Sequence, residues 1–220
     1  MCSIPPHKQL FVAIDNNNID KVKKILLKNN VDLLYKNPNQ DNETCLHRAV
    51  RIKNSTTCLK LLLNANEELL QLESKDGKSP FLLACSLGHY QSVEFIINKY
   101  IDNLEKLESI FYHVDDSRSN ALHYASEIEN YNIVEYILHV LNAKIQDETK
   151  NLKFINGKDA GNNTCLHKAS MVGSTRIVKL LMDNKADPTI KNFDDMTALD
   201  SVKLLEMSNS EELAQLLTSV

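Results

Sequence analysis

Apolar residues recur along this chain at three- and four-residue spacing, in short stretches separated by polar turns. This spacing places the apolar side chains on one face of a helix. It predicts helices at residues 9–15, 21–28, 56–64, 91–100 and 211–217, with Asp20 and Ser210 as caps. The apolar faces comprise Val22, Ile25 and Leu26; Cys58, Leu61 and Leu62; Val93 and Ile96; Val134 and Ile137; and Val178, Leu181 and Met182. The chain is therefore predicted to consist of short amphipathic helices.

A second set of short helices is predicted to begin at a recurring tetrapeptide. Thr-Cys-Leu-His occupies residues 44–47 and returns at 164–167, and weaker versions begin at residues 79, 120 and 197. An alanine follows four of the copies, at Ala49, Ala84, Ala125 and Ala169. The copies start 33 to 44 residues apart. Recurrence at this interval is the signature of a solenoid of stacked repeats.

This pattern resembles the Thr-Pro-Leu-His signature and the helix-pair period of ankyrin repeats, over roughly residues 8–217. The resemblance implies an α-class repeat solenoid of stacked antiparallel helix pairs joined by β-hairpin-like loops. We expect one domain over residues 1–220, with about six repeats, of which the first and last are caps. The expected repeats are residues 8–37, 38–73, 74–114, 115–156, 157–190 and 191–220.

Two segments are longer than the period of the family requires. Residues 101–114 carry apolar residues at helical spacing and are predicted to extend the preceding helix or to add a turn. Residues 142–158 are more polar and are predicted to form a longer helix followed by an exposed loop. Insertions in a solenoid map to one face, often the binding face. Variation in a tolerant surface loop explains them equally well.

The turn inside each helix pair needs a residue that accepts a positive φ. Gly88 and Gly173 supply it in two repeats. Asparagine tolerates this conformation better than most residues. We therefore assign the same role to Asn17 or Asn18, and to Asn54 and Asn130.

Composition narrows the class of protein. Of the 220 residues 43% are hydrophobic and 25% charged, as in a folded protein, and no apolar run is long enough to cross a membrane. The net charge of −4 comes without a basic stripe, which argues against nucleic acid as a partner. The five cysteines form no Cys-x-x-Cys pair, and we expect them to be free and structural. A cytoplasmic monomer is predicted, in the host cytoplasm if the protein is a secreted bacterial effector.

Cysteine lies close to histidine at residues 45–47 and 165–167, which raises the alternative of a small Cys/His enzyme. A catalytic cysteine needs one site with an activating base, and zinc needs clustered ligands. Equivalent copies spread along a solenoid provide neither. The resemblance implies that His47, His123 and His167 instead bond the backbone of the neighbouring loop. We expect no catalytic residue, no metal and no cofactor.

The resemblance implies a non-catalytic module that binds a partner protein on its concave face, as an adaptor or a secreted effector. An alternative is a masking inhibitor similar to I-kappa-B. The acidic stretch at residues 206–212 resembles the tail signals of type IV secreted proteins. In ankyrin repeats, the hairpin tips and the ends of each first helix make the contacts. These positions are Gln40, Glu43, Arg51, Ile52, Lys75, Lys78, Ser86, Leu87, Ser117, Ser119, Glu127, Ile128, Asn163, Met171, Val172, Phe193 and Met196.

Overall fold

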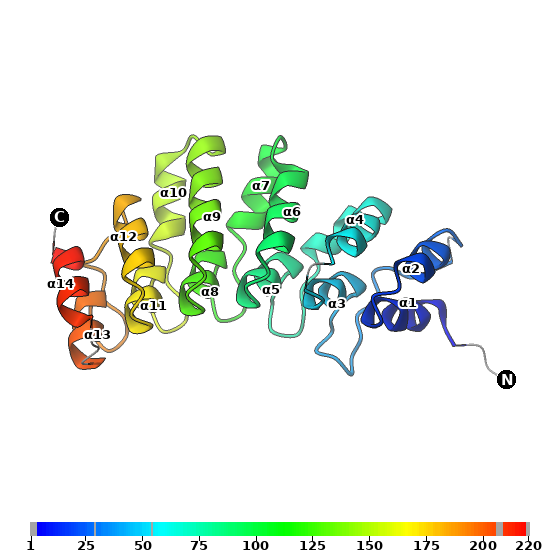
Figure 1. The fold of residues 1–220 in the computed structure, drawn as a ribbon, viewed down its shortest axis with the longest axis horizontal. Helices are drawn as coiled ribbons and strands as arrows, with labels where there is room; N and C mark the ends of the chain where they lie inside the picture. Colours follow the sequence, from blue (N-terminus) through cyan, green and yellow to red (C-terminus); the bar gives the residue numbers. More distant parts are fainter. Residues whose placement is uncertain (1–3, 29, 54, 206–208, 219–220) are drawn as a thin grey trace. The chain divides into compact units, whose positions relative to one another are not determined.

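The computed structural model describes residues 4–28, 30–53, 55–205 and 209–218. Among these residues it contains fourteen α-helices, one 3-10 helix and no strand (Figure 1). An isolated antiparallel bridge joins Asn37 to Glu43 in the first long loop. The helices group into two compact units, Met1–Lys99 and Tyr100–Val220.

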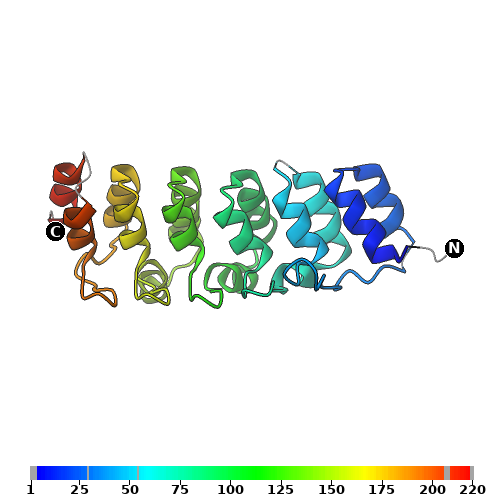
Figure 2. The ribbon, with the colours of Figure 1, turned by 90° about the horizontal axis from the view of Figure 1, so that it is seen from below.

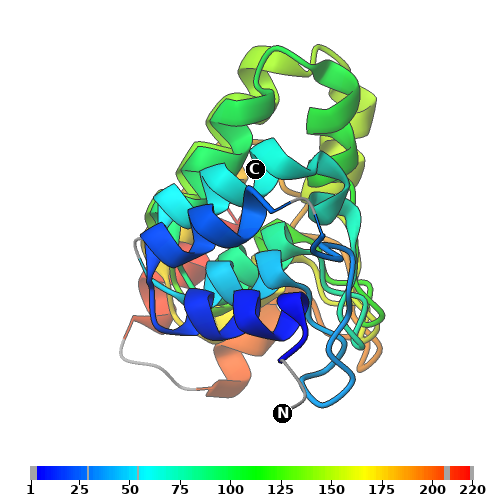
Figure 3. The same cartoon turned by 90° about the vertical axis from the view of Figure 1, so that its right-hand side faces the viewer.

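The first unit stacks helix pairs. The pairs are α1 (Pro6–Asp15) with α2 (Ile19–Leu26), α3 (Cys45–Arg51) with α4 (Thr56–Ala65), and α5 (Pro80–Ser86) with α6 (Tyr90–Tyr100), which ends at the unit boundary. The 3-10 helix η1 (Glu67–Gln71) follows α4. Helices α1, α3 and α5 pack in one row, and α2 packs on α4 in a second row (Figure 2). The loop that follows α2 runs along one side of these helices (Figure 3).

The second unit repeats the same plan with additional helices. It contains α7 (Leu104–Phe111), α8 (Ala121–Glu127), α9 (Tyr131–Lys144), α10 (Glu148–Ile155), α11 (Cys165–Met171), α12 (Thr175–Asp183), α13 (Ala198–Leu205) and α14 (Ser210–Thr218). Helices α8, α11 and α13 pack side by side as the first helices of their pairs, and α9, α12 and α14 form the second row.

Apart from α1, which follows Pro5 without a side-chain cap, the first helices start at a side-chain cap. Thr44, Asn120 and Thr164 accept a hydrogen bond from the backbone N–H three residues later, and each forms a capping box with the histidine at that position. Ser79 caps α5 in the same way, with proline in the first turn. Caps of this kind stabilise a helix by about 1 kcal/mol. They allow helices of only seven residues to begin at a fixed point.

The turns within the pairs confirm part of the prediction on positive φ. Asn17, Gly88 and Gly173 have φ values of 50°, 68° and 78°, while Asn54 lies outside the described residues. The assignment of Asn130 was wrong, because the preceding residue Glu129 takes the positive φ of 58°. The side chain of Asn130 is used instead as a cap, accepting from the backbone N–H of Ile133.

Four predicted helix starts were also displaced, that of α6 by one residue to Tyr90. Helix α1 begins at Pro6, which proline favours as a first helical residue. Helix α2 begins at Ile19 because Asn18, rather than Asp20, accepts the capping hydrogen bond, at 3.0 Å from the Lys21 N–H. Ser210 is the first residue of α14 and not its cap.

The two insertions are helical. Residues 101–114 form a separate helix, α7, rather than a continuation of α6. Residues 142–158 lengthen α9 as predicted, but the segment expected as an exposed loop is mostly the helix α10. Phe154 of α10 is buried and stacks on Phe111 of α7 with the ring centroids 6.1 Å apart, and Tyr112 meets it edge-on at 5.7 Å. The two insertions thus meet through a cluster of aromatic side chains.

Candidate functional site

The hairpin tips within each unit are joined by backbone hydrogen bonds. Lys75 N–H donates to the Asp41 carbonyl at 2.6 Å in the first unit. In the second, Ala160 N–H donates to Ser117 at 2.7 Å, and Phe193 N–H donates to Gly161 at 3.0 Å. The tips therefore form a continuous, ordered edge in each unit. From this edge Lys75, Ser117 and Phe193 project as exposed side chains.

The histidines of the tetrapeptide join each first helix to the next loop. The Nε2 atoms of His47, His123 and His167 lie 2.9, 3.0 and 3.1 Å from the carbonyl oxygens of Lys78, Asn163 and Met196. A carbonyl accepts only, so Nε2 carries the proton and donates. Burial lowers the pKa of all three imidazoles and keeps them neutral. The structural role implied for these histidines is confirmed.

The cysteines next to these histidines are poor nucleophiles. Cys45, Cys58, Cys85 and Cys165 are free and buried. Desolvation raises the pKa of the Cys45 and Cys165 thiols to about 12 and that of Cys58 to about 11. A thiol must ionise to attack a substrate, and these stay protonated at neutral pH. The Cys-x-His pairs therefore serve packing and capping.

The predicted contact residues differ in accessibility. Exposed residues are Arg51, Lys75, Leu87, Ser117, Glu127, Ile128, Met171, Val172 and Phe193. Partly exposed residues are Gln40, Ile52, Lys78, Ser86, Asn163 and Met196. Glu43 and Ser119 are buried, at 3% and 7% exposure. Glu43 lies between the guanidinium groups of Arg48 and Arg51, so it orients these arginines and offers little surface of its own.

Five exposed apolar side chains of the second unit lie at the C-terminal ends of its first helices. Ile128 follows α8, Met171 and Val172 end α11, and Leu204 and Leu205 end α13. Their exposed fractions range from 38% for Val172 to 69% for Leu204. Because α8, α11 and α13 pack side by side, these five side chains lie at corresponding ends of neighbouring helices. We call them the helix-end row.

Leu204 and Leu205 were missed in the sequence. The signal was present, since the last two tetrapeptides start at Thr164 and Thr197, and the same offset places Leu204 and Leu205 opposite Met171 and Val172. The correspondence was overlooked because the last copy of the tetrapeptide is weak, with aspartate in place of histidine. Asp200 nevertheless caps its helix, since its carboxylate accepts from both N–H and O–H of Thr197.

A charged belt lies between the hairpin tips and the helix-end row. Lys168 contacts the carboxylates of Asp159 at 3.1 Å and Glu127 at 3.8 Å. Burial would raise the pKa of Asp159, but hydrogen bonds from the backbone of Asn163 and from Lys168 outweigh it and lower the pKa. The surface thus combines an apolar row with fixed charges, as interfaces with a hydrophobic centre and a polar rim do.

The first unit is more polar at the corresponding positions. Leu87, after α5, is 38% exposed, and Ile52, after α3, is only partly exposed. Arg48, on α3 before Ile52, pairs with Asp15 at the end of α1 at 2.7 Å. The apolar part of the predicted surface is therefore concentrated in the second unit.

Two features are absent from the part of the chain that the structure describes. There, no group of three or more His, Cys, Asp or Glu side chains is placed to hold a metal ion. Within the same ranges, no helix has the length and hydropathy needed to span a bilayer.

Comparison with protein families gives two matches, both to ankyrin repeats. Residues 10–106 match a three-copy ankyrin profile and residues 161–193 match a single repeat, and together they cover more than half of the chain. Among curated proteins, the NAD-dependent deacetylase sir2B of Dictyostelium discoideum is 27% identical over 202 residues. That similarity covers 83% of this chain but only 25% of the deacetylase.

Solved structures with a similar fold include ankyrin repeat proteins. EF0377, an ankyrin repeat protein, has a TM-score of 0.75 at 22% identity, covering 97% of this chain and 98% of its own. The ankyrin repeat domain ABAYE2397 of Acinetobacter baumannii has a TM-score of 0.72 at 20% identity, covering 94% and 95%. A chain in the complex of the endopeptidase Bd0816 from Bdellovibrio bacteriovorus with the immunity protein Bd3460 also scores 0.72, at 22% identity and covering 96% and 97%.

Proposed function

Because this chain belongs to the ankyrin repeat family, whose solenoids generally serve as non-catalytic protein-interaction modules, we propose that it binds a partner protein through the face formed by its first helices and hairpin tips. The observation that carries the proposal is the helix-end row of Ile128, Met171, Val172, Leu204 and Leu205. Five large apolar side chains exposed together over three neighbouring helices form the kind of patch that marks an interaction site.

The charged belt and the hairpin tips supply the rim of this surface. Phe193 is 71% exposed at a tip and offers an aromatic side chain, a class that is enriched in the cores of protein interfaces. Glu127 and Lys168 lie between the tip and the helix-end row. We propose the same role for the exposed tip and helix-end residues of the first unit, with Arg51 and Lys75 providing charge.

Adaptor, secreted effector and masking inhibitor would all use this face, and they differ in what the partner does once bound. An adaptor leaves the partner active and available to a third protein. A masking inhibitor abolishes the partner's next binding event. The adaptor and the masking inhibitor are distinguished by testing whether the captured partner still binds its own ligand in the complex.

The test is affinity capture from a lysate with quantitative mass spectrometry, using wild type and Met171→Glu/Leu204→Glu. Both positions are largely exposed, so the charges should leave folding intact while placing two carboxylates in the centre of the helix-end row. The matched control is Leu104→Glu, an equally exposed leucine on α7 in the same unit. A protein captured by wild type and by the control, but lost with the double variant, supports the proposal. Equal capture by all three refutes it.

A further inference from the structure

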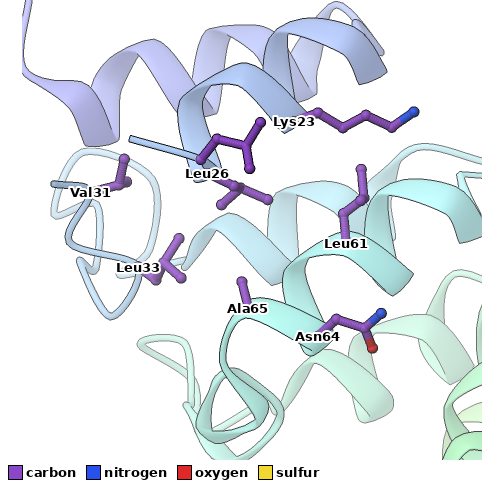
Figure 4. A pocket seen from close by; sticks show the side chains of 8 residues that line it. Lys23, Leu26, Val31, Leu33, Leu61, Asn64 and Ala65 are labelled. Atoms are coloured by element: carbon purple, nitrogen blue, oxygen red, sulfur yellow. The ribbon is translucent and has the colours of Figure 1, made fainter. Parts of the chain in front are cut away.

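An apolar groove lies on the other row of helices in the first unit. It has a volume of about 690 Å³ and is formed by α2, the loop after it and α4. Its apolar lining consists of Leu26, Leu27, Val31, Leu33, Leu61 and Ala65, with Lys23 and Asn64 at its border (Figure 4). The groove is separate from the proposed partner surface, because α2 and α4 are second helices of their pairs.

The leucines of this groove are at least partly exposed to solvent, unlike most other apolar side chains of α2 and α4. Leu27, directly after α2, is 80% exposed, whereas Val22 and Ile25 on the same helix are buried. Leu26, Leu33 and Leu61 are partly exposed. A groove of this size and lining is in the range of sites that take up apolar groups of a ligand.

Positive charge predominates on α2, which forms one wall of the groove, whereas the exposed acids Glu67 and Glu68 follow α4 in η1. Lys21, Lys23, Lys24 and Lys28 are exposed on or just beyond α2, and Lys60 is exposed on α4. In the ranges that the structure describes, none of these five ammonium groups forms an ion pair. The neighbouring acids on α2 and its loop are Asp20 and Asp32, and Asp32 already accepts a hydrogen bond from the Leu34 N–H at 3.1 Å. The groove is thus apolar, with Lys23 in its lining and further exposed lysines on or just beyond the same helix α2, on a chain whose net charge is −4.

We propose that this groove binds an acidic amphipathic helix of a partner protein. The apolar face of such a helix would place its side chains against Leu26, Leu27 and Leu61, and its carboxylates would face the lysines of α2 and α4. This is the helix-in-groove mode of recognition, in which apolar anchors recur at helical spacing. The opposite charge of the lysines selects acidic helices and disfavours basic ones.

The test uses a peptide display library in which the net charge of the peptides is not fixed in advance. Its peptides are about four helical turns long, with leucines fixed at the i, i+3 and i+7 spacing of one helix face. All other positions are drawn equally from alanine, glutamine, glutamate and lysine. Selection against the full chain should enrich glutamate over lysine at the flanking positions. Failure to select any peptide, or enrichment of lysine, overturns the proposal.

Variants then locate the selected peptide. Leu27→Asn/Leu61→Asn should weaken binding about tenfold or more, because each leucine loses the apolar contact made in the complex. The matched control Val12→Asn changes a half-exposed apolar residue on α1 and should bind as wild type does. Raising the salt concentration should weaken binding of the wild type, and less so of Lys23→Gln/Lys24→Gln. Binding that is insensitive to the leucine variants overturns the proposal.

Two further measurements test for a second copy of the chain in the groove and for independence from the helix-end row. If sedimentation shows a dimer that Leu27→Asn/Leu61→Asn dissociates, the groove is covered by a second copy of the chain and the proposal fails. Met171→Glu/Leu204→Glu should bind the peptide unchanged, since those residues lie in the second unit. Failure of this proposal is therefore distinguishable from failure of the proposed partner surface.

Discussion

His167→Ala should strongly destabilise the second unit. The ring is 1% exposed, and it connects the start of α11 to the loop before α13. Its Nδ1 accepts from Thr164 N–H at 3.2 Å and lies 2.9 Å from the Thr164 hydroxyl oxygen, and its Nε2 donates to the Met196 carbonyl at 3.1 Å. Truncation removes both hydrogen bonds to the backbone and leaves the buried N–H of Thr164 without its partner.

The size of the effect follows from these losses. The hydrogen bond to Met196 contributes about 1 kcal/mol, and the stranded Thr164 N–H costs about 1–2 kcal/mol. The space left by the imidazole adds about 1 kcal/mol, at the lower end of the cost of truncating a buried side chain. We therefore expect the free energy of unfolding to fall by about 3–4 kcal/mol, a large part of the stability of an ordinary domain.

The measurement is urea unfolding followed by circular dichroism, with His167→Asn as the matched variant. Asparagine can still accept from the Thr164 N–H, as Asp200 does from Thr197 in the last repeat, but it is too short to reach Met196. It should lose about half as much stability as the alanine variant. A loss below about 1 kcal/mol for His167→Ala would refute the assignment of both hydrogen bonds.

Two further results are expected. Because burial lowers the pKa of His47, His123 and His167 below the ordinary 6.5, the unfolded chain takes up protons first as the pH falls. Their contribution to stability is complete above pH 6.5 and is lost below it, so melting temperatures should drop between pH 7 and 5, and less so in His167→Asn. Phe154→Ala should cost about 3–5 kcal/mol in urea unfolding; little change would mean that α7 and α10 do not stabilise each other.

The sequence by itself determined the repeat, the helix pairs and the capping histidines. Each of these depends on local spacing or on a residue with one role in every copy. The tetrapeptide fixes where a first helix begins because Thr164 and His167 cap it locally. The buried alanine that follows lets neighbouring helices approach, and Ala49, Ala84, Ala125 and Ala169 are all fully buried.

Other features were decided only by tertiary contacts. The segment of α10 is polar enough that its sequence predicts a loop. It is a helix whose Phe154 is buried, because Phe111 of α7 and Tyr112, which follows α7, provide an aromatic surface for it. No local spacing in the sequence specifies that pairing.

The same distinction between local sequence and tertiary contacts applies to the helix-end row and to the groove. The positions of the helix-end row could be counted from the repeat offset, although Leu204 and Leu205 were overlooked. The groove of Leu26, Leu27 and Leu61 could not be predicted, since residues at helical spacing are equally suited to being covered. Whether an apolar face is buried depends on how closely the next segment packs. Only the tertiary structure shows that the loop after α2 leaves these leucines accessible.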